Sequence, residues 1–140
     1  MIPSQTLIDA LRAVVKEIEK PDSEWNWGDP SSCNCGLLAR KLGLSKEDIR
    51  TEVKSNWTLY VDKVCLKTGL PLPKVFATLR KYGITNQDIE DLEDIDMEIG
   101  IPHSEAVVDY CLNKANELEQ QLLSINSSKK KVEQKVSISL

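Results

Sequence analysis

The sequence predicts an all-α fold, a single compact bundle of five to seven helices joined by helix–Gly–cap–helix corners. Apolar residues recur at helical spacing through most of the chain, and strand-like alternation occurs only in the last few residues. Glycine or proline separates the periodic segments, and a serine or threonine often follows to start the next one. With 140 residues, the chain has the length of one domain.

The first predicted helix covers residues 4–20. Its apolar residues share one side at helical spacing, and they are Leu7, Leu11, Val14, Val15 and Ile18. Ser4 is a candidate N-cap, because its hydroxyl can accept a hydrogen bond from an unpaired N–H of the first turn. Pro21, Asp22 and Ser23 end this helix.

The next element holds the most unusual residues of the chain, and we call residues 25–44 the cysteine box. It reads W-N-W-G-D-P-S-S-C-N-C-G-L-L-A-R-K-L-G-L and contains two of the three tryptophans and two of the four cysteines. Asp29-Pro30 indicates a turn, so we expect Ser31 or Ser32 to be the N-cap of a helix. Gly43 suits the left-handed position that ends this helix.

The helix of the cysteine box is expected to be central, because both of its sides carry apolar residues. One side is formed by Cys35, Leu38, Ala39 and Leu42. The other side is formed by Cys33, Gly36, Leu37 and Arg40. The two thiols point about 200° apart around the helix, so neither a disulfide between them nor a shared metal fits. Gly36 suggests a close approach by another segment, such as the loop with Trp25 and Trp27.

Two helices follow the cysteine box. Ser45 opens the first, with Asp48 placed as in a capping box, and the helical pattern can continue as far as Leu66. A turn is expected at residues 68–71. Pro73 suits the first turn of the second helix, which ends at Gly83.

The last two predicted helices differ in length. Thr85 caps a short acidic helix, and residues 100–102 break the chain again. Ser104 is expected to cap a long final helix. Its apolar residues at helical spacing are Val107, Tyr110, Cys111, Leu118, Leu122 and Ile125.

Residues 38–49 and 78–89 match at an offset of 40 residues. Arginine, lysine, glycine, aspartate and isoleucine are identical in the two segments, and the cap is serine in one and threonine in the other. A duplication would produce this match. Any helix–Gly–cap–helix corner favours the same residues, however, so we favour an independent origin and leave a duplication open as the alternative.

The predicted domain comprises residues 1–126, and residues 127–140 form a Lys-rich tail that we expect to be flexible. The tail contains four of the 18 basic residues and one of the 22 acidic residues. The first 125 residues therefore carry 14 basic and 21 acidic residues, a net charge of −7. This charge argues against nucleic acid as a partner.

We expect a cytoplasmic protein that does not enter the membrane. No apolar run approaches the roughly 20 residues of a membrane span, and the N-terminus lacks the pattern of a signal peptide. The cysteines show no disulfide framework, so reduced thiols are expected.

Cys33 is the candidate nucleophile for a thiol-dependent enzyme or redox protein. A thiolate at the N-terminus of a helix is stabilised there, and Arg40 could add to this effect. The single histidine, His103, lies far along the chain and would have to approach Cys33 in the fold to act as a base. Papain-like proteases also place a cysteine at a helix start, but their C-G-x-C-W order differs from this one.

The sequence favours neither a metal site nor a DNA-binding site over ordinary packing of these residues in the core. The four cysteines and His103 lack the C-x₂-C or H-x₃-H spacing of metal sites, so no metal and no cofactor are indicated. The corner around Gly43 resembles a DNA-binding helix-turn-helix, but the helix after it is neutral overall. The corner around Gly83 is even less suited to binding DNA, because residues 86–105 hold eight acidic residues and no lysine or arginine.

The motif Trp27-Gly28…Cys33-Asn34-Cys35-Gly36-x-Leu38-Ala39 resembles a box in a group of uncharacterised bacterial all-helical proteins. The later corner, Gly83-Ile84-Thr85-x-x-Asp88, is similar to a second motif of that group. The resemblance covers most of residues 25–92 and implies an all-helical fold. It implies no activity, because the group has no agreed one.

The leading functional hypothesis is a non-enzymatic, cytoplasmic binding or protein-interaction module. Its candidate binding residues are Trp25, Trp27, Cys33, Asn34, Cys35, Gly36 and Arg40. A partner protein or a small ligand would bind there, and the oligomeric state is left open. The alternative is the thiol-dependent enzyme that uses Cys33. A solvent-reachable pocket at Cys33, with His103 or a carboxylate beside it, would favour that alternative.

Overall fold

The computed structural model of the protein describes residues 1–26, 31–56, 73–95 and 103–138. Within these ranges the chain forms helices and no strand. The helices are α1 (Gln5–Glu19), α2 (Asn34–Lys41), α3 (Lys46–Asn56), α4 (Pro73–Lys81), α5 (Asn86–Asp94) and α6 (His103–Ile138). The predicted all-α bundle of five to seven helices is therefore confirmed.

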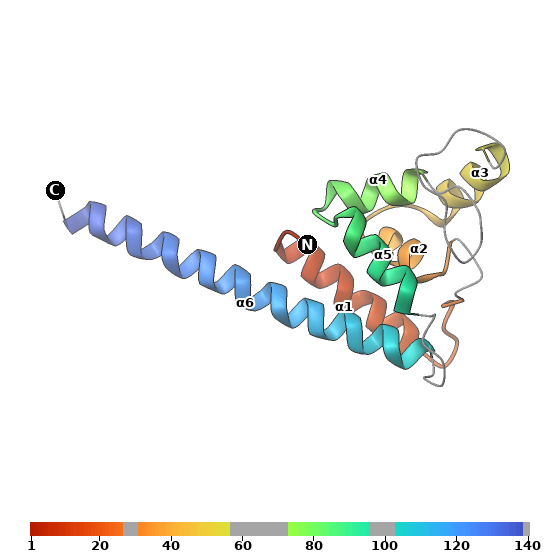
Figure 1. The fold of residues 1–140 in the computed structure, drawn as a ribbon, viewed down its shortest axis with the longest axis horizontal. Coiled ribbons are helices and arrows are strands. Elements are labelled where there is room, and N and C mark those ends of the chain that lie inside the picture. Colours follow the sequence, from red (N-terminus) through yellow and green to blue (C-terminus); the bar gives the residue numbers. More distant parts are fainter. Residues whose placement is uncertain (27–30, 57–72, 96–102, 139–140) are drawn as a thin grey trace.

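The helices form a body from which α6 projects. In Figure 1, α1 and the first half of α6 lie side by side in opposite directions, and α2 to α5 gather on one side of this pair. The second half of α6 continues past the N-terminal end of α1 and away from the other described helices. With 36 residues, α6 is about 54 Å long.

The interior position predicted for α2 is confirmed. This short helix packs on α1, α4 and α5. Six of its eight residues are buried, and they are Asn34, Cys35, Gly36, Leu37, Leu38 and Ala39. The apolar residues on both sides explain this burial, because a helix that is apolar all round is stable only inside a protein.

The pairing of α1 with α6 supplies a second part of the core. Ser4 is the N-cap of α1, as expected, and its hydroxyl accepts a hydrogen bond from the Leu7 N–H at 3.2 Å. On the surface of the pair, the Arg12 guanidinium donates to Glu119 at 2.9 Å. The buried residues of α6 recur at helical spacing, and they are Val107, Cys111, Ala115 and Leu118.

The corner between α2 and α3 has the expected glycine and cap. Gly43 has φ +114°, and its N–H donates to the Arg40 carbonyl at 3.0 Å. The Leu44 N–H donates to the Ala39 carbonyl at 3.1 Å, which completes a Schellman motif. The Ser45 hydroxyl then accepts from the first turn of α3.

The corner between α4 and α5 repeats this stereochemistry. Gly83 has φ +92°, and its N–H donates to the Arg80 carbonyl, while the Ile84 N–H donates to the Leu79 carbonyl. Thr85 and Asp88 form a reciprocal capping box at the start of α5. The two matching segments thus share one backbone design, and whether they arose by duplication stays open.

Two predicted N-caps are wrong by one or two residues. The N-cap of α2 is Cys33 rather than Ser31 or Ser32. The two serines instead hold the preceding loop, because the Ser32 carbonyl accepts from the Asn26 N–H and the Ser31 carbonyl from Arg40. Ser104 cannot cap α6, because the helix already begins at His103.

The C-terminal tail belongs to α6 as far as Ile138, and its expected flexibility stays a prediction. No glycine or proline follows residue 102, and lysine, glutamate and glutamine favour helix, so α6 continues through Ile138. The strand-like alternation at the C-terminus is therefore part of a helix as far as that residue.

The following predictions lie outside the described residues: the turn at Asp29-Pro30, the continuation of the third helix to Leu66, and the breaks at residues 68–71 and 100–102.

Candidate functional site

Asn34 connects the cysteine box to the neighbouring segments through hydrogen bonds of its side chain. Its side-chain oxygen accepts a hydrogen bond from the Trp25 indole N–H at 2.9 Å. Its amide nitrogen donates to the Leu92 carbonyl of α5 at 2.8 Å. This carbonyl belongs to the last turn of α5, where carbonyls lack helical partners. Asn34 therefore joins the tryptophan loop, the start of α2 and the end of α5.

Cys33 is buried, with 2% of its surface exposed. Its sulfur accepts a hydrogen bond from the Gly36 N–H at 3.4 Å and so caps α2. Cys35 is buried as predicted. The solvent-reachable thiol that an enzyme would need is therefore not provided by Cys33 in this structure. His103 is the first residue of α6, and its side chain lies outside the described part of the structure.

Arg40 makes an ion pair and a hydrogen bond with the loop before α2. Its guanidinium donates to the Ser31 carbonyl at 3.1 Å and to Glu24 at 2.8 Å. Lys46 also donates to Glu24, at 3.3 Å. The hydrogen bond from Arg40 and then that from Lys46 lower the pKa of Glu24. The guanidinium thus fastens the loop before α2 and is directed toward these oxygens rather than toward Cys33.

The structure brings together most of the predicted site residues, but in contacts within the protein. Trp25 donates to Asn34, and the Cys33 sulfur accepts from Gly36. Arg40 donates to the Ser31 carbonyl in the loop before α2. Trp27 lies outside the described residues. These contacts describe a structural joint between the loop and the core.

Glu52 is a buried polar residue that the sequence analysis did not identify. One of its carboxylate oxygens accepts from the Lys74 N–H at 2.8 Å, in the first turn of α4. Burial raises the pKa of Glu52, although the hydrogen bond from Lys74 acts in the opposite direction. Glu52 therefore caps α4 from α3. Its spacing of 22 residues from Lys74 gives no local signal in the sequence.

The amino group of Met1 forms another contact that the sequence analysis missed. It lies 3.0 Å from the Asp88 carboxylate, which also accepts from the Thr85 N–H and hydroxyl. The Ile2 N–H donates to the Gly83 carbonyl at 2.9 Å. The start of the chain is thus fastened to the corner between α4 and α5.

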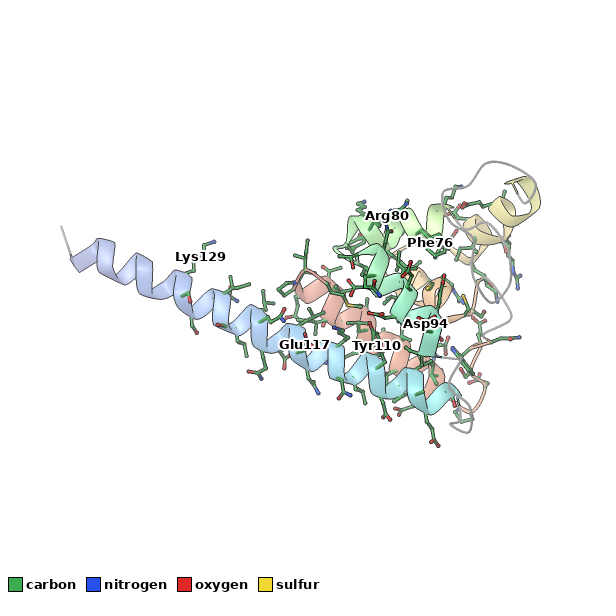
Figure 2. All side chains as sticks on the ribbon, in the orientation of Figure 1. Phe76, Arg80, Asp94, Tyr110, Glu117 and Lys129 are labelled. Carbon is green, nitrogen blue, oxygen red and sulfur yellow. The ribbon has the colours of Figure 1, made fainter. Side chains whose placement is uncertain are left out.

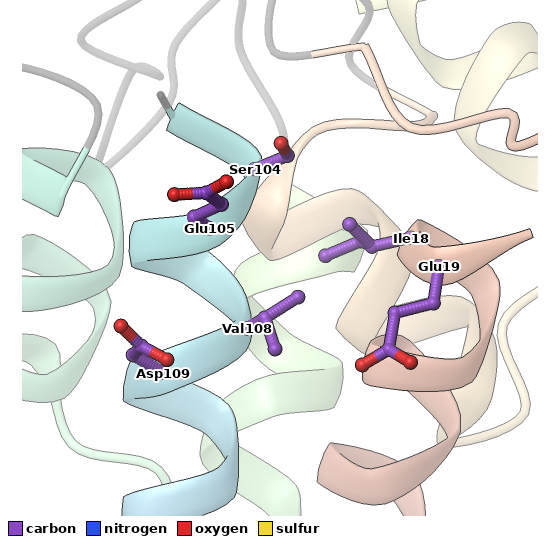
Figure 3. Close-up of a pocket in the computed structure, with 6 residues that line it drawn as sticks. All are labelled: Ile18, Glu19, Ser104, Glu105, Val108 and Asp109. Carbon is purple, nitrogen blue, oxygen red and sulfur yellow. The ribbon is translucent and has the colours of Figure 1, made fainter. Parts of the chain in front are cut away.

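Two grooves lie on the surface of the described body. The first lies between the end of α1 and the start of α6, where Ile18 and Val108 are flanked by three carboxylates (Figure 3). These carboxylates belong to Glu19, Glu105 and Asp109. The second groove lies between residues 2–6 and 80–83 and carries Arg80 and Lys81. Neither groove has a cysteine or histidine among its described lining residues.

Over the described ranges, no group of three or more metal-ligating side chains is placed to hold an ion. None of the described helices combines the length and apolar character needed to cross a bilayer. Comparisons of the chain with family models, curated proteins and solved structures found no match.

Proposed function

We propose that this protein is a non-enzymatic interaction module of the cytoplasm, with the helical body as a rigid base and the projecting part of α6 as the binding element. The observation that carries this proposal is the exposed apolar surface on α6. Leu123 and Ile125 are 55% and 53% exposed and come directly after Leu122, which packs against the core. Exposed apolar side chains on a projecting helix are typical of helix-mediated recognition.

The cysteine box supports this proposal by its internal contacts. Asn34, Arg40 and the Cys33 sulfur are bonded within the protein. These polar groups of the box are thus engaged in contacts that build the base. Among the described cysteines, Cys33, Cys35 and Cys111 are buried in the body.

Site-specific photo-crosslinking in the cells that produce the protein tests this proposal. A photoreactive amino acid would replace Ile125 in one variant and Leu112 in the other. Leu112 is also an exposed apolar residue of α6. It lies between Val108, which faces Ile18 of α1, and Asn116, which accepts from Arg12 of α1. We expect a discrete protein adduct from position 125 and none from position 112. Equal labelling from both positions, or no adduct from either, would contradict the proposal.

A further inference from the structure

The projecting part of α6 continues an apolar seam that begins in the body. We define the seam as the α6 positions that alternate by three and four residues. They are Val108, Cys111, Ala115, Leu118, Leu122, Ile125, Lys129, Val132 and Val136. Cys111, Ala115 and Leu118 are buried in the body, Leu122 is partly buried, and Ile125 is 53% exposed. The body thus covers the first half of the seam, whereas Ile125 and Lys129, which begin what we call the open half, are exposed.

The covered half of the seam shows what kind of element fits it. There α1 packs along α6 in the opposite direction, as one helix against another. The same three–four spacing continues to Val136, and this spacing is typical of coiled-coil packing. A second helix, continuing the path of α1 beyond its N-terminal end, would complete the same interface.

The positive charge of the projecting segment indicates which charge the second helix should carry. Lys129 occupies a seam position and is exposed on the projecting segment (Figure 2). Residues 126–140 carry four lysines and one glutamate, a net charge of +3. A lysine at a seam position selects a partner that supplies a carboxylate opposite it. We propose that the open half of the seam, around Ile125 and Lys129, binds an acidic amphipathic helix of a partner protein.

A second copy of the same segment fits this surface less well. A parallel pair would place Lys129 opposite its equivalent, and an antiparallel pair of the open halves would bring residues 129–131 of both copies together. Like charges at a helix interface disfavour both arrangements. A lipid surface is also disfavoured, because Lys129 interrupts the apolar face and residues 126–138 contain no aromatic residue and no leucine.

This inference rests on the proposed function and can be tested with the full chain and a synthetic probe. The probe is a three-heptad peptide with leucine and isoleucine at its seam, flanking glutamates and one central seam glutamate to face Lys129. Fluorescence anisotropy would measure its affinity. We expect Ile125→Glu to weaken binding by about tenfold or more. The matched variant Leu112→Glu, at an exposed α6 residue outside the seam, should leave binding unchanged.

A charge exchange tests the role of Lys129. Lys129→Glu should weaken binding of the peptide with central glutamate and strengthen binding of the same peptide with central lysine. Equal binding of the first peptide to wild type, Ile125→Glu and Lys129→Glu would overturn the inference, as would self-association of the wild type through the seam or preferential binding to anionic phosphatidylglycerol vesicles. A neutral or basic partner crosslinked at position 125 would overturn the inference while leaving the proposed function intact.

Discussion

At the scale of single residues, Asn34 has the largest structural role in the cysteine box. Its amide group accepts a hydrogen bond from the Trp25 indole N–H and at the same time donates one to the Leu92 carbonyl. Asn34 is almost fully buried. Its partners come from the loop before α2 and from α5, so one side chain couples three parts of the chain.

We predict that Asn34→Ala lowers the free energy of unfolding by about 2–4 kcal/mol, because it leaves buried polar groups of two partners unpaired. Urea denaturation would measure the change. Asn116→Ala is the matched control, since Asn116 makes a single long hydrogen bond of 3.4 Å to Arg12 on the surface. An equal effect of the two substitutions would argue against the bridging role of Asn34.

The described thiols should be slow to react in the native protein. Cys33, Cys35 and Cys111 are each at most 2% exposed, and burial raises the pKa of Cys111 to about 12. We expect iodoacetamide to modify them only when urea unfolds the chain, as measured by peptide mass spectrometry. Rapid native labelling of Cys33 alone would instead support the thiol-dependent enzyme.

At the scale of secondary-structure elements, the two helix corners share one design but differ in their surroundings. Both glycines adopt positive φ. A Cβ atom built on Gly43 meets nothing within 4 Å among the described atoms, whereas one on Gly83 would lie 2.7 Å from the Ile2 Cβ. The second corner therefore needs its glycine for two reasons, the backbone conformation and the approach of the N-terminal segment.

We predict that Gly43→Ala costs about 1–2 kcal/mol of unfolding free energy, from the left-handed backbone alone. Gly83→Ala should cost more, by about 1–3 kcal/mol, because the added methyl group overlaps Ile2. Thermal denaturation of both variants would give the difference. Adding Ile2→Gly to Gly83→Ala removes the contacting side chain, so the extra cost should be absent from the double variant.

The corner between α4 and α5 should also be sensitive to acid. Burial by itself raises the pKa of Asp88, but hydrogen bonds from the Thr85 N–H, the Met1 amino group and the Thr85 hydroxyl outweigh it and lower the pKa. A lowered pKa in the folded state means that ionised Asp88 stabilises the fold above its unfolded pKa. That stabilisation is lost as the pH falls through the folded pKa.

We therefore predict that Asp88→Asn lowers stability at neutral pH and reduces the loss of stability between about pH 4 and lower values. Urea denaturation across this range would measure both effects. Asp109→Asn is the control, because Asp109 is an exposed carboxylate on α6. An unchanged acid dependence in Asp88→Asn would mean that other carboxylates determine it.

At the scale of the whole molecule, the body and the projecting helix divide the charge of the chain. The first 125 residues have a net charge of −7, and the last part of α6 is basic. Figure 2 shows Lys129 on the projecting segment, clear of the body, whereas Glu117 lies nearer to it. The acidic base and the basic projection can thus act as separate surfaces.

We predict that deletion of residues 128–140 leaves the melting temperature of the isolated protein unchanged. The described residues around this cut, 123–129, are exposed, so the deletion removes little buried area from the body. A longer deletion from residue 119 should lower the melting temperature, because it removes Leu122 and the partner of Arg12. A fall of several degrees after the shorter deletion would show that the tail packs on another part of the protein or on a second chain.

The sequence by itself determined the helical class, the corners and the burial of the box helix. Helical spacing, Gly43 and Gly83 at positive φ, and caps such as Ser4 and Thr85 act within a few residues, so local patterns contain them. The two-sided apolar pattern of α2 indicated its interior position for the same reason.

Only the tertiary structure decided which polar groups meet and what the cysteine box does. Asn34 reaches Leu92 across 58 residues, and Glu52 caps α4 across 22, and no local pattern specifies such distant partners. The burial of Cys33 likewise depends on what packs around the start of α2.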